Sequence, residues 1–241
     1  MAEHRPLTRR DLFRFAAASG VAAAVGSHAD QGGPHPAAAQ VQHPRTPEEA
    51  LTLLRAGNER YAKRQDTMTM LKANMQTIRD GTTTAQFPFA AVLACADSRI
   101  PPEIAFDQTI GQLFVVRVAG NIVTPDSMAS LEYAAHVLTR PPTGGEPTVK
   151  VIVVLGHGNC GAVSAAESVK VVPGQISALY PPIRAAIGQS TGDAAIRANA
   201  RAQAALLTAS SPVIRNRVMT DRNLHVVAWY YNVATGEVSP A

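Results

Sequence analysis

The sequence predicts an α/β fold, with a mostly parallel central sheet flanked by helices. Short apolar runs that suit buried strands alternate with stretches of helical periodicity, which is the pattern of a parallel sheet. Two of these runs end in a turn that carries a cysteine. With 241 residues and 46% apolar content, the chain can bury the core of one such domain.

Four apolar runs are the expected strands. The first, residues 87–94, is apolar at nearly every position, as expected for a strand covered on both faces. The others are residues 113–118, 149–155 and 224–233, of which 149–155 is the most hydrophobic. Ligands of such sheets bind beyond the carboxyl ends of the strands.

Helices are expected at residues 46–63, 125–138, 161–169, 191–207 and 211–219. The first has the clearest start, because Thr46 can cap it and Pro47 suits its first position. Residues 65–82 suggest a further helical segment, so 46–80 is expected to form an N-terminal helical arm. The apolar stretch 176–187 is expected to be broken by Pro181 and Pro182.

Residues 1–39 are predicted to be a signal peptide and processing region. Paired arginines, Arg9 and Arg10, precede an apolar run of about eleven residues, too short to span a bilayer of ~30 Å. The pattern is typical of a secretory signal, and the arginine pair resembles a twin-arginine signal. We expect cleavage after Ala29 or Ala39, export to the bacterial periplasm, and a linker at 40–45 before the domain at 46–241. The alternative is a disordered basic tail.

The net charge of +4 is modest and includes no basic block. Nucleic-acid binding is therefore a poor interpretation, and no stable membrane span is expected.

Cys95 and Cys160 are the only cysteines, and His157 lies three residues before the second. Two thiolates and an imidazole favour zinc, and three protein ligands leave one position open, as in catalytic sites. The competing interpretation is one disulfide, the default for two cysteines in an oxidising compartment. It would not explain the nearby histidine.

Asp97 and Arg99 follow Cys95 closely. Asp97 is either a fourth zinc ligand, which would close the site, or a group that orients bound water while Arg99 pairs with it bidentately. A third interpretation is an Asp–Arg bridge that only fixes the loop. Zinc lowers the pKa of water from 15.7 to about 7, so the metal would be the main source of catalysis.

Two motifs, Cys-Ala-Asp-Ser-Arg at 95–99 and Gly-His-Gly-Asn-Cys-Gly-Ala at 156–162, resemble the signatures of the β-class carbonic anhydrases. The resemblance covers about residues 45–239. Further matching segments lie at residues 56–61, 114–121, 131–134 and 230–236.

The resemblance implies one zinc ion per subunit on Cys95, His157 and Cys160, with Asp97 and Arg99 as the catalytic dyad. Its other implied site residues bind substrate: Gln86 orients it, the Gly161 N–H contacts an anion, and Phe114 and Tyr133 line the pocket.

The implied activity is that of a carbonate dehydratase, the reversible hydration of carbon dioxide to bicarbonate and a proton by zinc-bound hydroxide. A homodimer or higher homo-oligomer is implied, with residues 46–80 as its dimerisation arm and pockets at the interface. The resemblance also implies an added antiparallel strand, for which residues 224–233 are the candidate.

This sequence departs from the family pattern at three positions. Ala96 and Gly158 replace more common hydroxyl-bearing residues, and Val92 stands where some members have a tryptophan of a regulatory bicarbonate site. We therefore expect no sigmoidal inhibition by bicarbonate. Two other functions fit the motifs: a carbon disulfide or carbonyl sulfide hydrolase, and a non-catalytic zinc-binding module.

Overall fold

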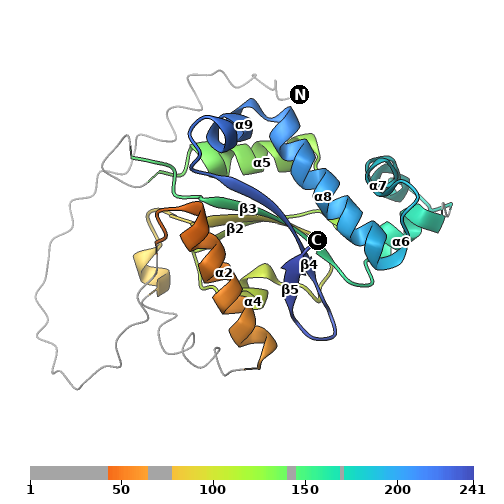
Figure 1. Ribbon diagram of the computed structural model, residues 1–241, viewed down its shortest axis with the longest axis horizontal. Helices are drawn as coiled ribbons and strands as arrows, with labels where there is room; N and C mark the ends of the chain where they lie inside the picture. The colour runs from red at the N-terminus through yellow and green to blue at the C-terminus, as the bar shows by residue number, and fades with distance from the viewer. Residues whose placement is uncertain (1–42, 65–77, 140–144, 169–170) are drawn as a thin grey trace, which may run out of the picture. The chain divides into compact units, whose positions relative to one another are not determined.

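The computed structural model describes residues 43–64, 78–139, 145–168 and 171–241 (Figure 1). They belong to one compact unit, Ala38–Ala241. The predicted signal region, residues 40–42 of the linker and residues 65–77 of the predicted arm lie outside the described residues, so those assignments stay predictions. Within the described ranges, no helix has both the length and the apolar character needed to cross a membrane.

The centre of the unit is a five-stranded sheet with strand order β2-β1-β3-β4-β5. Its strands are β1 Ala90–Ala94, β2 Leu113–Arg117, β3 Val151–His157, β4 His225–Tyr231 and β5 Val238–Pro240. The first four are parallel, and β5 pairs antiparallel with β4. The predicted mostly parallel sheet with an antiparallel edge strand is confirmed.

The expectation that residues 224–233 form the antiparallel strand was wrong. β4 runs parallel to β3, because the intervening helices carry the chain back to the amino end of the sheet. The antiparallel strand is instead β5, which follows β4 after a short turn closed by the Gly236 N–H···O=C Asn232 hydrogen bond of 2.8 Å.

Seven α-helices have bounds in the described part of the chain: α2 Pro47–Ala62, α4 Pro102–Ala105, α5 Pro125–His136, α6 Gly161–Ser168, α7 Tyr180–Ile187, α8 Gly192–Ser210 and α9 Pro212–Met219. Two 3-10 segments, η1 Ala119–Asn121 and η2 Ile176–Leu179, complete the list. As expected, the stretch 176–187 is divided at its prolines: η2 ends at Leu179, and α7 begins at Tyr180, immediately before Pro181 and Pro182. They lie in its first turn, where a missing backbone N–H costs nothing.

Helices cover both faces of the sheet, which explains why the strands are apolar at successive positions. Val92 of β1 belongs to the core shared with α2 and α4, whereas its neighbour Leu93 belongs to the core shared with α5, α8 and α9. Figure 1 shows these two groups of helices on opposite sides of the sheet.

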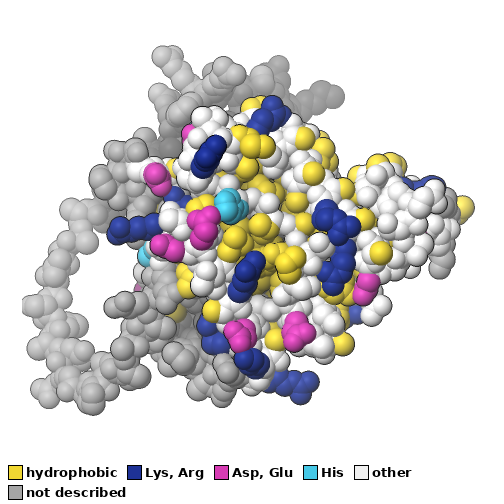
Figure 2. All heavy atoms as spheres, viewed as in Figure 1, with side chains coloured by type: hydrophobic (Ala, Val, Ile, Leu, Met, Phe, Trp, Pro, Cys, Tyr) yellow, Lys and Arg dark blue, Asp and Glu magenta, His cyan; other side chains and the backbone are white. Residues whose placement is uncertain are grey.

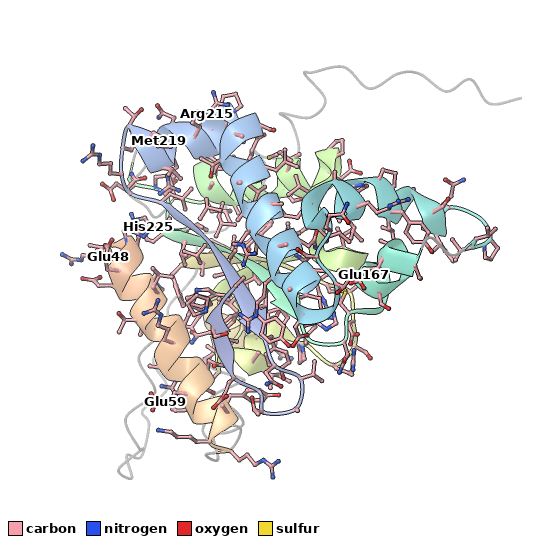
Figure 3. All side chains as sticks on the ribbon, turned by 45° about the vertical axis from the view of Figure 1, so that its right-hand side comes forward. Glu48, Glu59, Glu167, Arg215, Met219 and His225 are labelled. Atoms are coloured by element: carbon pink, nitrogen blue, oxygen red, sulfur yellow. The ribbon has the colours of Figure 1, made fainter. Side chains whose placement is uncertain are left out.

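Helix α2 contacts the rest of the unit through polar side chains near each of its ends. Asn58 is buried and donates to the carbonyls of Ala105 (3.0 Å) and Gly236 (2.8 Å), while it accepts from the N–H of Val238 (2.8 Å). Near the other end, Glu48 and His225 point toward one another (Figure 3), 3.5 Å apart. Beside α2, Figure 2 shows hydrophobic side chains gathered over β4 and β5.

Candidate metal site

The sheet brings the two cysteine-bearing turns together. β1 and β3 are parallel neighbours in which Ala94 pairs with Leu155, so both strands end at the same edge. Cys95 is the first residue after β1, His157 is the last residue of β3, and Cys160 immediately precedes α6. Residues 62 positions apart in sequence thus meet at the carboxyl edge of the sheet, as predicted.

The three predicted ligands form one buried cluster. One ligand atom from each of Cys95, His157 and Cys160 lies within 4.8 Å of the others. His157 has 0% exposed surface, Cys95 4% and Cys160 2%. Both cysteines are free thiols, so the structure does not contain the disulfide of the competing interpretation.

His157 has its tautomer set by the backbone. Its Nδ1 lies 3.0 Å from the carbonyl oxygen of Gly158, which can only accept a hydrogen bond, so Nδ1 carries the proton. The Gly158 N–H in turn donates to the Tyr231 carbonyl (2.9 Å). The other nitrogen, Nε2, is buried without a hydrogen-bond partner among the described residues. A buried lone pair of this kind, beside two thiols, fits a metal ligand.

A hydrogen bond between the two cysteines shifts their pKa values in opposite directions. The pKa of Cys95 is lowered, first because the Cys160 thiol donates a hydrogen bond to it, and also because the Gly120 N–H does. The same interaction raises the pKa of Cys160. Gly120 lies on the 3-10 turn after β2, and its N–H is 3.2 Å from Cys95 Sγ.

Arg99 holds Asp97 as a bidentate partner beside the cluster. Arg99 Nε donates to Oδ1 (2.9 Å), Nη2 donates to Oδ2 (2.7 Å), and the Arg99 backbone N–H also reaches Oδ1 (2.9 Å). These hydrogen bonds hold the pKa of the Asp97 carboxyl well below its usual range. Asp97 Oδ2 lies 3.9 Å from His157 Nε2, close to the ligands but outside hydrogen-bonding distance.

Two arginines tie the Cys95–Arg99 turn to its neighbours. Arg117, the last residue of β2, donates from Nε to the Cys95 carbonyl (3.0 Å) and from Nη2 to the Asp97 carbonyl. Arg99 Nη2 also reaches the Asn159 carbonyl (3.2 Å) in the second turn. The contacts of Arg117 and Gly120 were not predicted. The available signal was their place in the segment 114–121 that matches the family.

The predicted substrate-binding residues are divided between two places. Gly161 opens α6 directly after Cys160 and is exposed, and a Cβ there would meet no atom within 4 Å, so its backbone can be approached closely. Gln86 precedes β1, so the whole strand, about 16 Å long, separates it from the cluster.

Phe114 and Tyr133 contact each other rather than the cluster. Their ring centroids are 6.3 Å apart, and Tyr133 is 46% exposed on α5. Tyr133 and Gln86 line the same surface hollow, near the amino end of β1. Within one chain, these three residues are thus remote from the predicted ligands.

Comparisons with known proteins identify the family of this chain. The family model described as "Carbonic anhydrase" matches residues 90–238, more than half of the chain. A carbonic anhydrase of Pseudomonas aeruginosa is 35% identical over 173 residues, which cover 64% of this chain and 74% of the relative. Carbonic anhydrase 2 of Mycobacterium tuberculosis is 40% identical over 120 residues, 50% of this chain; the match spans about half the length of that relative, 52%.

Among solved structures, the tetrameric β-carbonic anhydrases of Sordaria macrospora share the fold. The TM-score is 0.57 at 24% identity, covering 75% of this chain and 94% of the other. The shared fold and the matched family model converge on one assignment. This chain belongs to the carbonic anhydrase family and has the fold of its β class.

Proposed function

We propose that the protein catalyses the reversible hydration of carbon dioxide to bicarbonate and a proton. The observation that carries this proposal is the buried Cys95–His157–Cys160 cluster with the Arg99-bound carboxylate of Asp97 beside it. The named activity of the relatives supports it.

Cys95, His157 and Cys160 would hold a zinc ion. The donor set of two sulfurs and one imidazole is that of catalytic zinc sites. The Nε2 of His157, which bonds no residue in the described ranges, is oriented by the Nδ1–H···O=C bond to Gly158. When bound, zinc supplies a hydroxide nucleophile near neutral pH and acts as a Lewis acid.

Asp97 would orient the attacking water. Its lowered pKa keeps it a carboxylate at neutral pH, so it accepts hydrogen bonds and does not store a proton. The proton released by hydration must therefore leave to solvent or buffer. Arg99 engages both carboxylate oxygens, which holds Asp97 in place for water and opposes its movement onto the metal.

Gln86, Phe114 and Tyr133 would act through a second copy of the chain. Within one chain, β1 separates Gln86 from the metal ligands, so a role in substrate binding requires a neighbouring subunit. The Sordaria macrospora relatives are tetrameric, and we propose a homo-oligomer here. The Gly161 N–H, next to Cys160, would contact the anionic product from within the same chain.

The proposed activity is tested by stopped-flow carbon dioxide hydration on protein of measured zinc content. Activity should scale with zinc, and Cys160→Ser should lose both together. A zinc-loaded protein that hydrates carbon dioxide no faster than buffer would refute the proposal. Parallel assays with carbonyl sulfide and carbon disulfide distinguish a related hydrolase.

We also propose export through a twin-arginine-type signal, on the basis of Arg9 and Arg10 and the short apolar run that follows. Cell fractionation of the bacterium that makes the protein should recover it from the periplasm. Replacing both arginines with lysine should keep it in the cytoplasm, and unchanged export of that variant would contradict the proposal.

A further inference from the structure

A chain of buried amide groups runs from helix α8 to the sulfur of Cys95. Asn199 Nδ2 donates to the Gly120 carbonyl (2.8 Å), and the Gly120 N–H donates to Cys95 Sγ (3.2 Å). Behind Asn199, Gln203 Nε2 donates to Asn199 Oδ1 (3.2 Å) and Gln203 Oε1 accepts from the Val123 N–H (2.8 Å). The two side chains of α8 thus bond the turn that follows β2 at Gly120, its middle residue, and at Val123, just beyond it.

Both amide side chains are buried, where an amide destabilises the fold unless its hydrogen bonds are made. Asn199 is 0% exposed and Gln203 2%, on a helix whose other inward residues are mostly apolar. Burying such a group is tolerated only when its hydrogen bonds are made, and the bonds then fix one geometry. The spacing of four residues puts Asn199 and Gln203 on one face of α8, toward the turn.

Gly120 needs such support because its own backbone is permissive. Its φ is 73°, in the left-handed region, and a Cβ would meet Ile183 Cδ1 at 2.8 Å, so the position requires glycine. Glycine leaves the orientation of its peptide groups weakly determined. The hydrogen bond from Asn199 to the Gly120 carbonyl removes that freedom.

We propose that Asn199 and Gln203 are positioning residues for Cys95. They hold the Gly120 turn so that its N–H points at Sγ, and this contact sets the orientation and donor strength of the sulfur as a metal ligand. The proposal rests on metal binding by Cys95, His157 and Cys160, as proposed above. Groups that orient metal ligands from behind typically change metal affinity by about 10- to 100-fold when they are removed.

The test uses two nearly isosteric variants of the full chain, Asn199→Leu and Gln203→Met. Zinc affinity is measured by competition with a chromogenic chelator. The Gly120 amide resonance is followed by NMR in both metal-free and zinc-loaded protein. The matched control is Asn58→Leu, which removes another buried amide that bonds three backbone groups without any link to Cys95.

We expect Asn199→Leu to weaken zinc binding by about 10-fold or more and to shift the Gly120 amide resonance in both forms. Gln203→Met should produce smaller changes in the same direction, because Gln203 reaches the Gly120 carbonyl only through Asn199 and otherwise bonds Val123, farther from Cys95. Asn58→Leu should lower the melting temperature without either effect. If Asn199→Leu does not fold, Gln203→Met alone decides the question.

Unchanged zinc affinity and an unmoved Gly120 resonance in the folded variants would overturn the proposal. So would an equal loss of zinc affinity in Asn58→Leu, since the effect would then be general destabilisation. If the unmodified protein does not bind zinc, the proposed function fails. In that case the Gly120 resonance of the metal-free variants still decides whether Asn199 positions the turn.

Discussion

Arg99 engages both carboxylate oxygens of Asp97, at 2.9 and 2.7 Å, while Asp97 Oδ2 remains 3.9 Å from Nε2 of His157. The carboxylate therefore lies beside the proposed metal ligands without joining them. A planar guanidinium makes this possible, because its two parallel N–H groups match both oxygens of one carboxylate. Arg99 is also 45% exposed in its side chain, so it borders the approach from solvent.

Replacing Asp97 should separate metal binding from catalysis. Asp97→Asn keeps the shape but loses the anionic acceptor, so we expect kcat/KM for carbon dioxide hydration to fall by about 100-fold or more. Zinc content should stay at the wild-type level, because Asp97 is not among the three proposed ligands. Metal analysis and stopped-flow kinetics on one preparation check both. Undiminished hydration would favour the interpretation in which the Asp97–Arg99 ion pair only fixes the loop.

Arg99→Lys tests whether the two-point contact between Arg99 and Asp97 matters for catalysis. Lysine keeps the charge but offers one point of contact, so Asp97 would be held less firmly and could approach the metal. We expect a loss of kcat/KM smaller than that of Asp97→Asn. Zinc should bind at least as tightly as in the wild type. Wild-type kinetics in Arg99→Lys would show that charge alone is sufficient.

The sequence was most informative about features that depend on neighbouring residues, such as the strands beside the predicted ligands. The apolar runs before Cys95 and up to His157 each required a buried strand, and parallel strands end at a common edge, so the meeting of the ligands could be predicted. The direction of β4 could not, because it depends on where α8 and α9 return the chain. Asn199 and Gln203 were hidden in an Ala-rich stretch interpreted only as helical, although two amides spaced by four residues were visible there.

Gly57 should be intolerant of any side chain. A Cβ at this position would lie 1.8 Å from the backbone carbonyl oxygen of Phe106, so α2 would have to move away from α4. We expect Gly57→Ala to lower the free energy of unfolding by about 1–3 kcal/mol, in spite of alanine's better helix propensity. Gly81→Ala is the control, because its Cβ would meet nothing within 4 Å. Equal urea midpoints for the two variants would contradict the close contact.

The separation of Gln86 from the metal ligands predicts complementation between subunits. Gln86→Ala and Cys160→Ser should each have low activity, for different reasons: the first keeps its zinc and the second does not. If Gln86 serves the neighbouring subunit of a dimer, random re-association of an equal mixture restores about a quarter of the sites. Activity is measured before and after subunit exchange. No gain, despite exchange confirmed by mass spectrometry, would place the action of Gln86 elsewhere.

Lys150 and Glu146 should make part of the stability depend on pH. Lys150 is buried, with 5% of its side chain exposed, and its Nζ donates to Glu146 Oε2 (2.8 Å). This hydrogen bond lowers the pKa of Glu146 from its ordinary value of 4.5. The pair therefore stabilises the fold above about pH 4.5, and this contribution is lost as pH falls through the lower pKa of the folded state. Glu146 is 71% exposed, so solvent screens part of this contribution, and the cost of protonation falls on the buried ammonium of Lys150, which loses its counter-charge.

Glu146→Gln should lower the melting temperature at pH 7, and the difference from the wild type should shrink as pH falls through the lowered pKa of Glu146 and the wild-type carboxyl takes up its proton. Taking the difference between the two proteins at each pH cancels any loss of metal that both share. Glu59→Gln is the matched control. Glu59 is 63% exposed and Glu146 71%, so solvent reaches both carboxylates alike, but their lysine partners differ: Lys63 is 60% exposed, whereas Lys150 is buried. It should change the melting temperature little at any pH. A constant difference for Glu146→Gln from pH 7 to pH 3 would mean that the amide disturbs packing, and that the ion pair with Lys150 contributes nothing.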